Sequence, residues 1–162
     1  MTLLIYSPKI SERLKYICKQ LFDRMLGVNI DITSTIEQFI AHKDAKISYA
    51  TQPLSNEFFI PSNILLFEKS IHFQDIDIKK WKGLPCFFYS EHENASIPFD
   101  IFASSFYLIT RYEEYLCQQY DSLGRFEAES SLAYQNKFLH LPLIDLWLIE
   151  LCLLYTSDAA DD

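Results

Sequence analysis

Glycine is scarce in this sequence, with only three among 162 residues. Gly27, Gly83 and Gly124 lie far apart, so no G-x-G or G-x-x-x-x-G-K segment occurs. A phosphate-binding loop needs clustered glycines, because its backbone must approach the phosphates closely. The sequence therefore excludes the common nucleotide-binding loops.

Basic residues and long apolar runs are also in short supply. Fourteen Lys and Arg stand against 22 Asp and Glu, which gives a net charge of −8. Proteins that bind nucleic acid normally carry an excess of basic residues that neutralise phosphates, so we expect no nucleic-acid partner. No apolar run approaches the roughly 20 residues of a membrane-spanning helix, and we expect no membrane partner either.

The cysteines and the N-terminus indicate the compartment. Cys18, Cys86 and Cys117 form no C-x-x-C pair and lie in apolar surroundings, which is typical of buried thiols in a reducing compartment. The short apolar start after Met1 has no basic residues before it, unlike a signal peptide. We therefore expect a cytoplasmic protein.

The last eleven residues differ in character from the rest. The segment 152–162 follows an apolar run without a helix-capping signal, and it resembles the translation of a transposase-type sequencing adapter. We expect it to be a non-native, adapter-derived tail. On this interpretation the natural reading frame continues past Leu151, inside a helix that starts near Leu143.

The hydrophobic pattern predicts an α/β fold. The first fifty residues alternate between period-two segments and segments with i, i+3, i+4 spacing. They predict strands at 3–6, 28–32 and 46–49, with helices after Ser11 and after Thr33 or Ser34, and Gly27 as a helix C-cap. Short apolar runs at 57–60, 64–67, 71–73 and 86–89 predict further strands on the same sheet. From Pro98 the pattern becomes helical and apolar nearly all round. We expect a mixed sheet with flanking helices and a central buried helix near 98–118.

Few residues form a pattern with catalytic chemistry. The four histidines form no H-x-x-x-H pair, and Ser104-Ser105 has no G-x-S-x-G context. Glu91-His92-Glu93 is expected to be a solvated loop, and Asp75 and Asp77 a surface pair. We therefore predict no catalytic, cofactor-binding or metal-binding residue in this chain.

A group of charged and tyrosine side chains follows the predicted helix. Arg111 can reach Glu114 or Tyr115 across one helical turn. We expect a partly buried polar network that consists of Arg111, Tyr112, Glu113, Glu114, Asp121 and Arg125. It either fixes the helix-to-turn geometry or faces a ligand or a second domain. If the partner charges are buried, Arg111→Ala would cost about 3–5 kcal/mol.

The most distinctive stretch is IPFDIFASSFYLITRYEEY at residues 97–115. It is followed by Asp121, Gly124-Arg125-Phe126, Phe138-Leu139, Pro142, Asp145 and Trp147. This pattern resembles the N-terminal domain of unknown function that precedes the catalytic domain of Bacteroidetes-type polysaccharide deacetylase-like proteins. The resemblance is clearest over residues 97–147.

The resemblance implies that residues 1–151 are a truncated, non-catalytic accessory α/β domain. Its parent would be a metal-dependent hydrolase that removes acyl groups from a polysaccharide. A divalent, zinc-like metal held by Asp and His would lie in the downstream catalytic domain, which would also be the partner of this domain. Two alternatives stay open: a glycan- or protein-binding module unrelated to an esterase, and a small α/β enzyme with a polar site at Arg111–Arg125.

Overall fold

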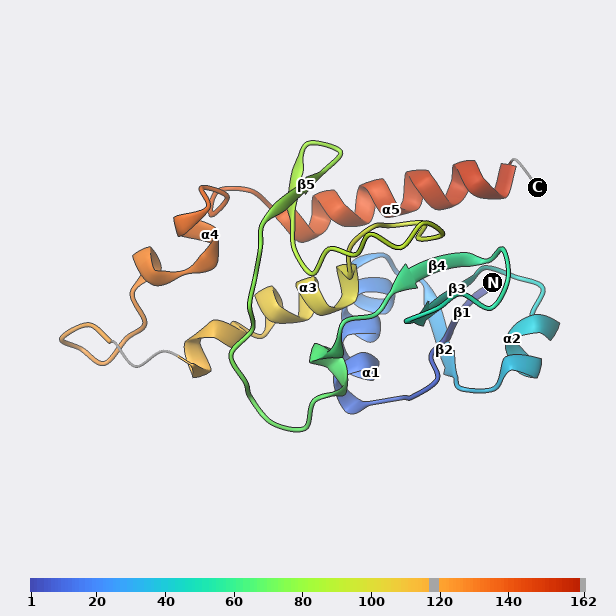
Figure 1. Ribbon diagram of the computed structural model, residues 1–162, viewed down its shortest axis with the longest axis horizontal. Coiled ribbons are helices and arrows are strands. Elements are labelled where there is room, and N and C mark those ends of the chain that lie inside the picture. Colours follow the sequence, from blue (N-terminus) through green and yellow to red (C-terminus); the bar gives the residue numbers. More distant parts are fainter. Residues whose placement is uncertain (117–119, 161–162) are drawn as a thin grey trace.

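A parallel sheet forms one end of the molecule in the computed structural model, which describes residues 1–116 and 120–160 (Figure 1). Its four strands are all parallel, in the order β2-β1-β3-β4. Their bounds are β1 Thr2–Tyr6, β2 Asn29–Thr33, β3 Lys46–Ala50 and β4 Phe58–Pro61. The predicted β-α-β-α-β start is confirmed, because helices connect these first three strands.

Two helical segments cover opposite faces of this sheet. Helix α1 (Glu12–Cys18) continues directly into a π-helix, η1 (Lys19–Met25), and the short helix α2 is Ile36–Ala41. Alternate residues of β1 separate into two clusters, since side chains along a strand point to opposite faces. Leu3 and Ile5 join the main core with α1, whereas Leu4 and Tyr6 pack with Phe39 of α2.

Glycine ends the first helical segment as predicted. Gly27 has a φ of +67° and donates its N–H to the carbonyl of Asp23. An L-residue with a side chain would be strained in this left-handed conformation. Cys18 and Cys86 are buried as expected, whereas Cys117 lies outside the described residues.

The prediction that the middle of the chain adds several strands to one sheet was wrong. Of the predicted runs, only the first joins the parallel sheet, as β4. Residues 64–67 form a 3₁₀-helix, η2 (Ile64–Phe67), because the Asn63 side chain caps it by accepting from the N–H of Leu65 at 3.0 Å. Residues 71–73 have no regular secondary structure. Strands β5 (Lys79–Trp81) and β6 (Leu84–Cys86) form a separate antiparallel hairpin, with positive φ at Lys82 and Gly83.

The outer edge of β4 is covered by an irregular segment. The N–H of Ser96 donates to the carbonyl of Phe59 at 2.8 Å, and the Ser96 hydroxyl accepts from the N–H of Phe59 at 2.9 Å. Both backbone groups of Phe59 on this side are therefore satisfied within the chain.

The central helix is buried as predicted but shorter. Helix α3 is Ile101–Ile109, and its residues from Ile101 to Tyr107 are all buried. It begins at 101 because the Asp100 carboxylate caps it, accepting from the N–H of Ala103 at 2.8 Å. It ends before Arg111, which has a left-handed φ of +53°. The chain continues as a 3₁₀-helix, η3 (Tyr112–Tyr115), and the rest of the predicted span, 117–118, lies outside the described residues.

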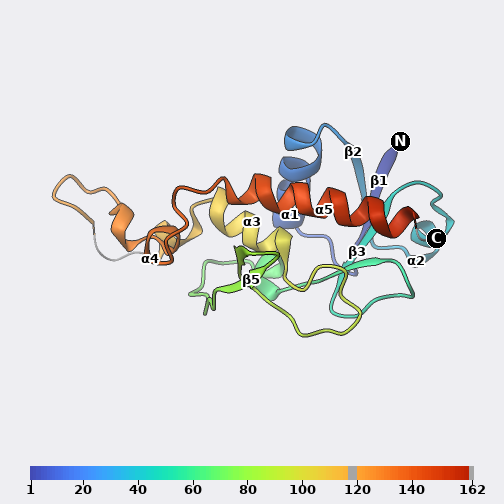
Figure 2. The same ribbon diagram turned by 90° about the horizontal axis from the view of Figure 1, so that it is seen from above.

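The last helix is longer than predicted. Helix α5 (Leu143–Ala160) starts beside the β5–β6 hairpin and runs back toward the parallel sheet (Figures 1 and 2). Trp147 is fully buried and donates its indole N–H to the carbonyl of Pro85 at 2.9 Å. Near the other end, the Tyr155 hydroxyl accepts from the N–H of Lys46 at 3.1 Å. The predicted tail thus continues α5 up to residue 160, and its adapter origin stays a prediction.

Residues 110–116 and 120–137 extend from α3 away from the sheet, and we refer to them as the distal lobe (Figure 1). Besides η3, the described part of this lobe contains η4 (Ala128–Ser130) and helix α4 (Leu132–Gln135). The fold as a whole is α/β, as the sequence predicts. Among the described residues, no helix combines the length and the apolar character needed to cross a membrane.

Candidate functional site in the distal lobe

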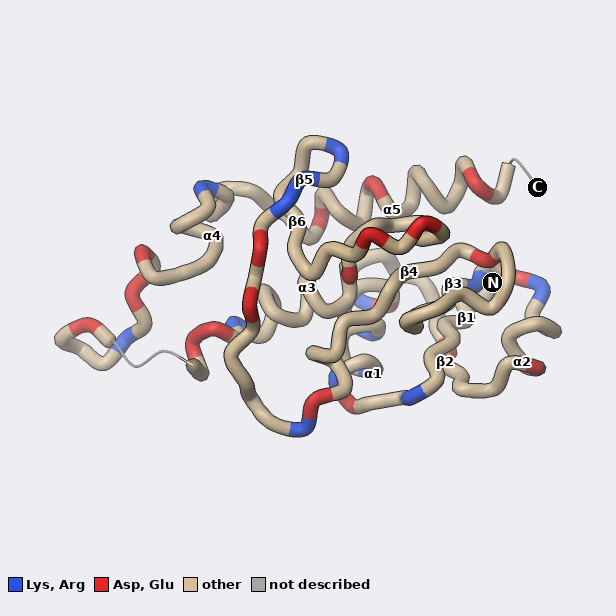
Figure 3. Tube along the Cα trace, in the orientation of Figure 1, with Lys and Arg blue, Asp and Glu red and all other residues tan. Residues whose placement is uncertain are grey.

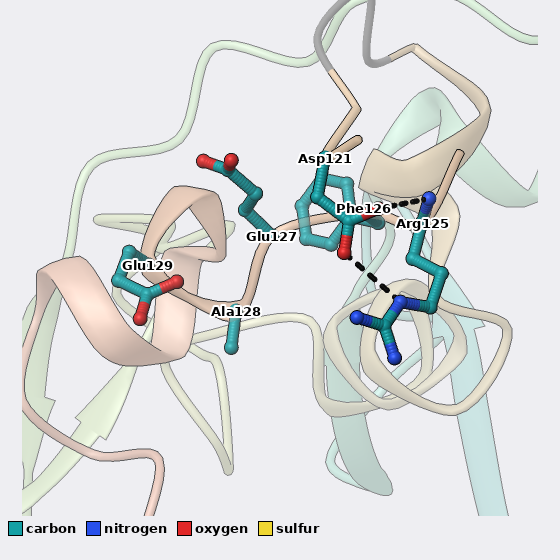
Figure 4. A pocket seen from close by; sticks show the side chains of 6 residues that line it. All are labelled: Asp121, Arg125, Phe126, Glu127, Ala128 and Glu129. Atoms are coloured by element: carbon teal, nitrogen blue, oxygen red, sulfur yellow. Dashed lines mark hydrogen bonds and ion pairs between the residues drawn. The ribbon is translucent and has the colours of Figure 1, made fainter. Parts of the chain in front are cut away.

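The predicted polar network contains two local ion pairs on the surface. Arg111 contacts Glu114 with Nη2 and Oε1 2.5 Å apart, and Arg125 contacts Asp121 with Nε and Oδ2 2.9 Å apart. The second pair is reinforced because the Arg125 N–H donates to Oδ1 of Asp121 (Figure 4). Both arginine side chains are exposed, at 72% and 69%. Exposed pairs of this kind contribute about 0–1 kcal/mol. The cost of about 3–5 kcal/mol for Arg111→Ala was expected only for buried partner charges, and this pair does not meet that condition.

The other two members of the predicted network face the interior. The Tyr112 hydroxyl accepts from the N–H of His72 at 2.9 Å, which holds the irregular segment after η2 against η3. The Glu113 carboxylate accepts from the N–H of Leu132 at 2.9 Å, which ties η3 to α4. Burial, and to a smaller degree the charge of Glu114, raises the pKa of Glu113. Tyr112 and Glu113 therefore connect parts of the fold.

Three pockets meet at the half-buried side chain of Phe126. The first, of about 600 Å³, is lined by the Asp121–Arg125 pair and the acidic run that follows it (Figure 4). The second, of about 710 Å³, is lined by the Arg111–Glu114 pair, by Arg125 and by the exposed residues Tyr115 and Tyr120. The third, of about 400 Å³, lies between the distal lobe, α3 and the irregular segment before β5.

The third pocket brings together residues that the sequence does not connect with one another. Phe73, Tyr107, Phe126 and Gln135 line it, together with Asp75 and Glu113. These residues come from separate parts of the chain, so no local spacing connects them. Phe73 belongs to the apolar run 71–73, which predicts a strand, so the sequence gives no sign of its exposure at the pocket.

The remaining charged motifs lie on the surface, as the sequence predicts. Glu91 and Glu93 are exposed in a loop, and the imidazole Nε2 of His92 contacts Oε1 of Gln52 at 3.0 Å. Asp75 and Asp77 are exposed, and Asp77 lies 4.0 Å from the Lys79 ammonium. Within residues 1–116 and 120–160, no three His, Cys, Asp or Glu side chains converge as a metal site requires.

A buried carboxylate, Asp100, holds the sheet to the central helix. It accepts hydrogen bonds from the Tyr49 hydroxyl at 2.5 Å and from the N–H of Asn63 at 2.6 Å, besides capping α3. Burial raises its pKa to about 6, although each of these hydrogen bonds acts in the opposite direction. Burial and the Asp100 charge raise the pKa of Tyr49 as well.

The carboxyl edge of the parallel sheet is occupied by the chain itself. Open α/β sheets bind ligands where the strand order reverses, here between β1 and β3. The segment after β4 lies against this point and covers the start of α1. The Ser11 hydroxyl donates to the carbonyl of Leu66, and the Arg13 guanidinium donates to the carbonyl of Leu65 at 2.8 Å. The usual ligand crevice is therefore filled by η2.

Comparison with known proteins gives one match. The sequence matches a family of unknown function (DUF7033) over residues 3–157, a range that includes residues 152–157 of the predicted tail. No curated protein matches the chain. No solved structure matches it either.

Proposed function

Since the chain belongs to the DUF7033 family of unknown function, we propose that it is a non-catalytic accessory domain of a polysaccharide deacetylase-like protein. The observation that carries this proposal is the burial of residues 97–107, which are all buried except the half-buried Pro98 and form the first part of the block on which the resemblance depends. Its side chains at Ile97, Phe99 and Phe102 have no exposed surface, and Asp100 joins β3, η2 and α3. This part of the block therefore specifies a fold rather than a reaction centre.

The filled crevice at the sheet edge supports the same proposal. In enzymes with open α/β sheets, that edge is where substrates and cofactors bind. Here Ser11 and Arg13 bind the backbone of η2, so the helix start that could face a ligand contacts the protein instead. A domain built in this way provides shape and contact surface to a partner.

The partner in this proposal is a catalytic domain downstream in the same polypeptide. A divalent, zinc-like metal held there would polarise the acyl carbonyl and activate water. No residue of the present chain is assigned to that metal. We place the protein in the cytoplasm as part of the same proposal.

The decisive experiment is to determine the sequence of the gene beyond the codon for Leu151 and to express the longer protein. We expect the added sequence to encode Asp and H-x-x-x-H metal ligands, and the longer protein to release acetate from an acetylated glycan in a metal-dependent way. The present chain alone should release none. Acetate release by the present chain, or added sequence without such ligands, would contradict the proposal.

A second candidate is a binding module that acts without an esterase. It is favoured by the exposed rings of Tyr115 and Tyr120 in the pocket beside the two ion pairs. Aromatic rings next to polar groups are a common way to bind sugars or peptides. A glycan that binds the chain, combined with downstream sequence lacking metal ligands, would favour this candidate.

A further inference from the structure

The pocket of about 400 Å³ beside α3 is assembled from several separate segments of the chain. Phe73 and Asp75 come from the irregular segment before β5, Tyr107 from α3 and Glu113 from η3. Phe126 and Gln135 complete it from the distal lobe. Its volume lies within the range of small-ligand sites, which is roughly 300–1,000 Å³.

The charged side chains that line this pocket, among the described residues, are all acidic. Asp75 and Glu113 both line it, and no Lys or Arg is found among the described residues that do so. Arg111 and Arg125 line the neighbouring pocket, where each is already paired with a carboxylate. Figure 3 shows acidic residues both on the segment before β5 and in the distal lobe. The pocket therefore favours a cationic ligand over an anionic one.

The uncharged part of the lining indicates the shape of the ligand. The Phe73 side chain is 81% exposed at the pocket, and the half-buried ring of Phe126 forms another wall. Such rings offer flat apolar faces against which the C–H face of a sugar ring can pack. Gln74 and Gln135 add amide groups that can both donate to and accept from hydroxyls.

We propose that this pocket binds an amino sugar with a free ammonium group, as one unit of a partly deacetylated polysaccharide. The ammonium group lies between the carboxylates of Asp75 and Glu113, and the sugar ring packs against Phe73. The choice of a polysaccharide rests on the function proposed above, whereas the preference for a cation rests on the pocket alone.

Isothermal titration calorimetry of the full chain tests this inference with two probes. One is a hexasaccharide of β-1,4-linked glucosamine, and the other is its fully N-acetylated counterpart. We expect the glucosamine hexasaccharide to bind at least about tenfold more tightly, because only its amines are charged. Added salt should weaken its binding, since salt screens partly exposed charges.

Three variants assign the effect to the pocket. Glu113→Gln keeps an oxygen that can accept from the N–H of Leu132 and should weaken binding about tenfold. Asp75→Asn should weaken it about threefold because this carboxylate is exposed. Asp77→Asn is the matched control: it removes the same charge two residues away and does not line the pocket, so binding should be unchanged.

Several results would overturn the inference. The first is equal affinity for both hexasaccharides, and the second is no binding at millimolar concentration. The third is a loss of affinity on Asp77→Asn as large as that on Asp75→Asn, which would indicate a diffuse charge effect. The two proposals fail separately. Absence of binding leaves the accessory-domain proposal intact if the downstream sequence encodes metal ligands. Specific binding without those ligands supports the pocket and contradicts the deacetylase link.

Discussion

The Tyr49 hydroxyl donates a hydrogen bond to the Asp100 carboxylate across 51 residues of sequence, inside the core. Tyr49 lies on β3 and Asp100 caps α3, so this contact connects the central helix with the parallel sheet. Phe102 packs on the same tyrosine ring, with the two ring centroids 5.0 Å apart.

Removing the Tyr49 hydroxyl should destabilise the fold measurably. We expect Tyr49→Phe to lower the free energy of unfolding by about 1–3 kcal/mol, because the buried carboxylate loses a donor. Urea denaturation of Tyr49→Phe, Asp100→Asn and the double variant measures the coupling between the two side chains. Tyr16→Phe, at a partly exposed ring, is the control and should change little. Additive effects of the two core substitutions would contradict this account.

The same carboxylate makes stability depend on pH. Because burial raises the pKa of Asp100 to about 6 in the folded protein, the folded state binds its proton more tightly than the unfolded state does. Its contribution is complete below about pH 4 and is lost as the pH rises through about 6. The full loss is on the order of 3 kcal/mol.

The comparison of wild type with Asp100→Asn isolates this effect from other titrating groups. As the pH rises from 4 to 7, wild type should lose stability relative to the variant in urea denaturation. A difference that does not change with pH would show that Asp100 does not titrate in this range. Glu57, whose pKa is lowered by backbone hydrogen bonds despite its partial burial, acts in the opposite direction in both proteins and cancels in the comparison.

Arg111 tests whether the polar network has more than a structural role. Its φ of +53° is unfavourable for a residue with a side chain. Arg111→Gly should therefore relieve about 1 kcal/mol of strain, which offsets the lost ion pair with Glu114. Arg111→Ala retains the strain and should lower stability by under about 1 kcal/mol. Unchanged acetate release by the longer protein carrying Arg111→Ala would assign the ion pair to the fold, whereas lost turnover at unchanged stability would favour the enzyme alternative.

Shortening the chain to residues 1–151 tests the end of α5. The change removes the contact of Tyr155 with Phe58, whose ring centroids lie 5.2 Å apart, and its hydrogen bond to Lys46. It leaves Trp147 in place, buried against Phe99. We expect a loss of about 1–2 kcal/mol with native tryptophan fluorescence retained. A shortened chain with a solvent-exposed tryptophan spectrum would show that residues 152–160 are required for folding.

Local features of the fold could be predicted from the sequence, and its long-range contacts could not. The spacing of Leu14, Ile17 and Leu21 predicts a helix because all three face one core. The four apolar residues Ile64–Phe67 predict a strand, although such a run fits a strand and a buried turn equally well. The Asn63 cap stabilises the turn instead.

The candidate site shows the same limit. The Arg111–Glu114 and Asp121–Arg125 pairs could be predicted because the partners are three or four residues apart. The pocket at Phe126 could not, because Phe73 and Tyr107 reach it only through the path of the whole chain. The exposure of the arginines likewise depends on how far the distal lobe extends from the body.

The hydrogen bonds between Ser96 and the outer edge of β4 have a consequence for assembly. A sheet can lengthen by adding a strand from another molecule only where main-chain donors and acceptors face outward. Since Ser96 already occupies both groups of Phe59, strand exchange between copies is blocked on that flank. Any such growth would have to begin at β2, on the opposite border of the sheet.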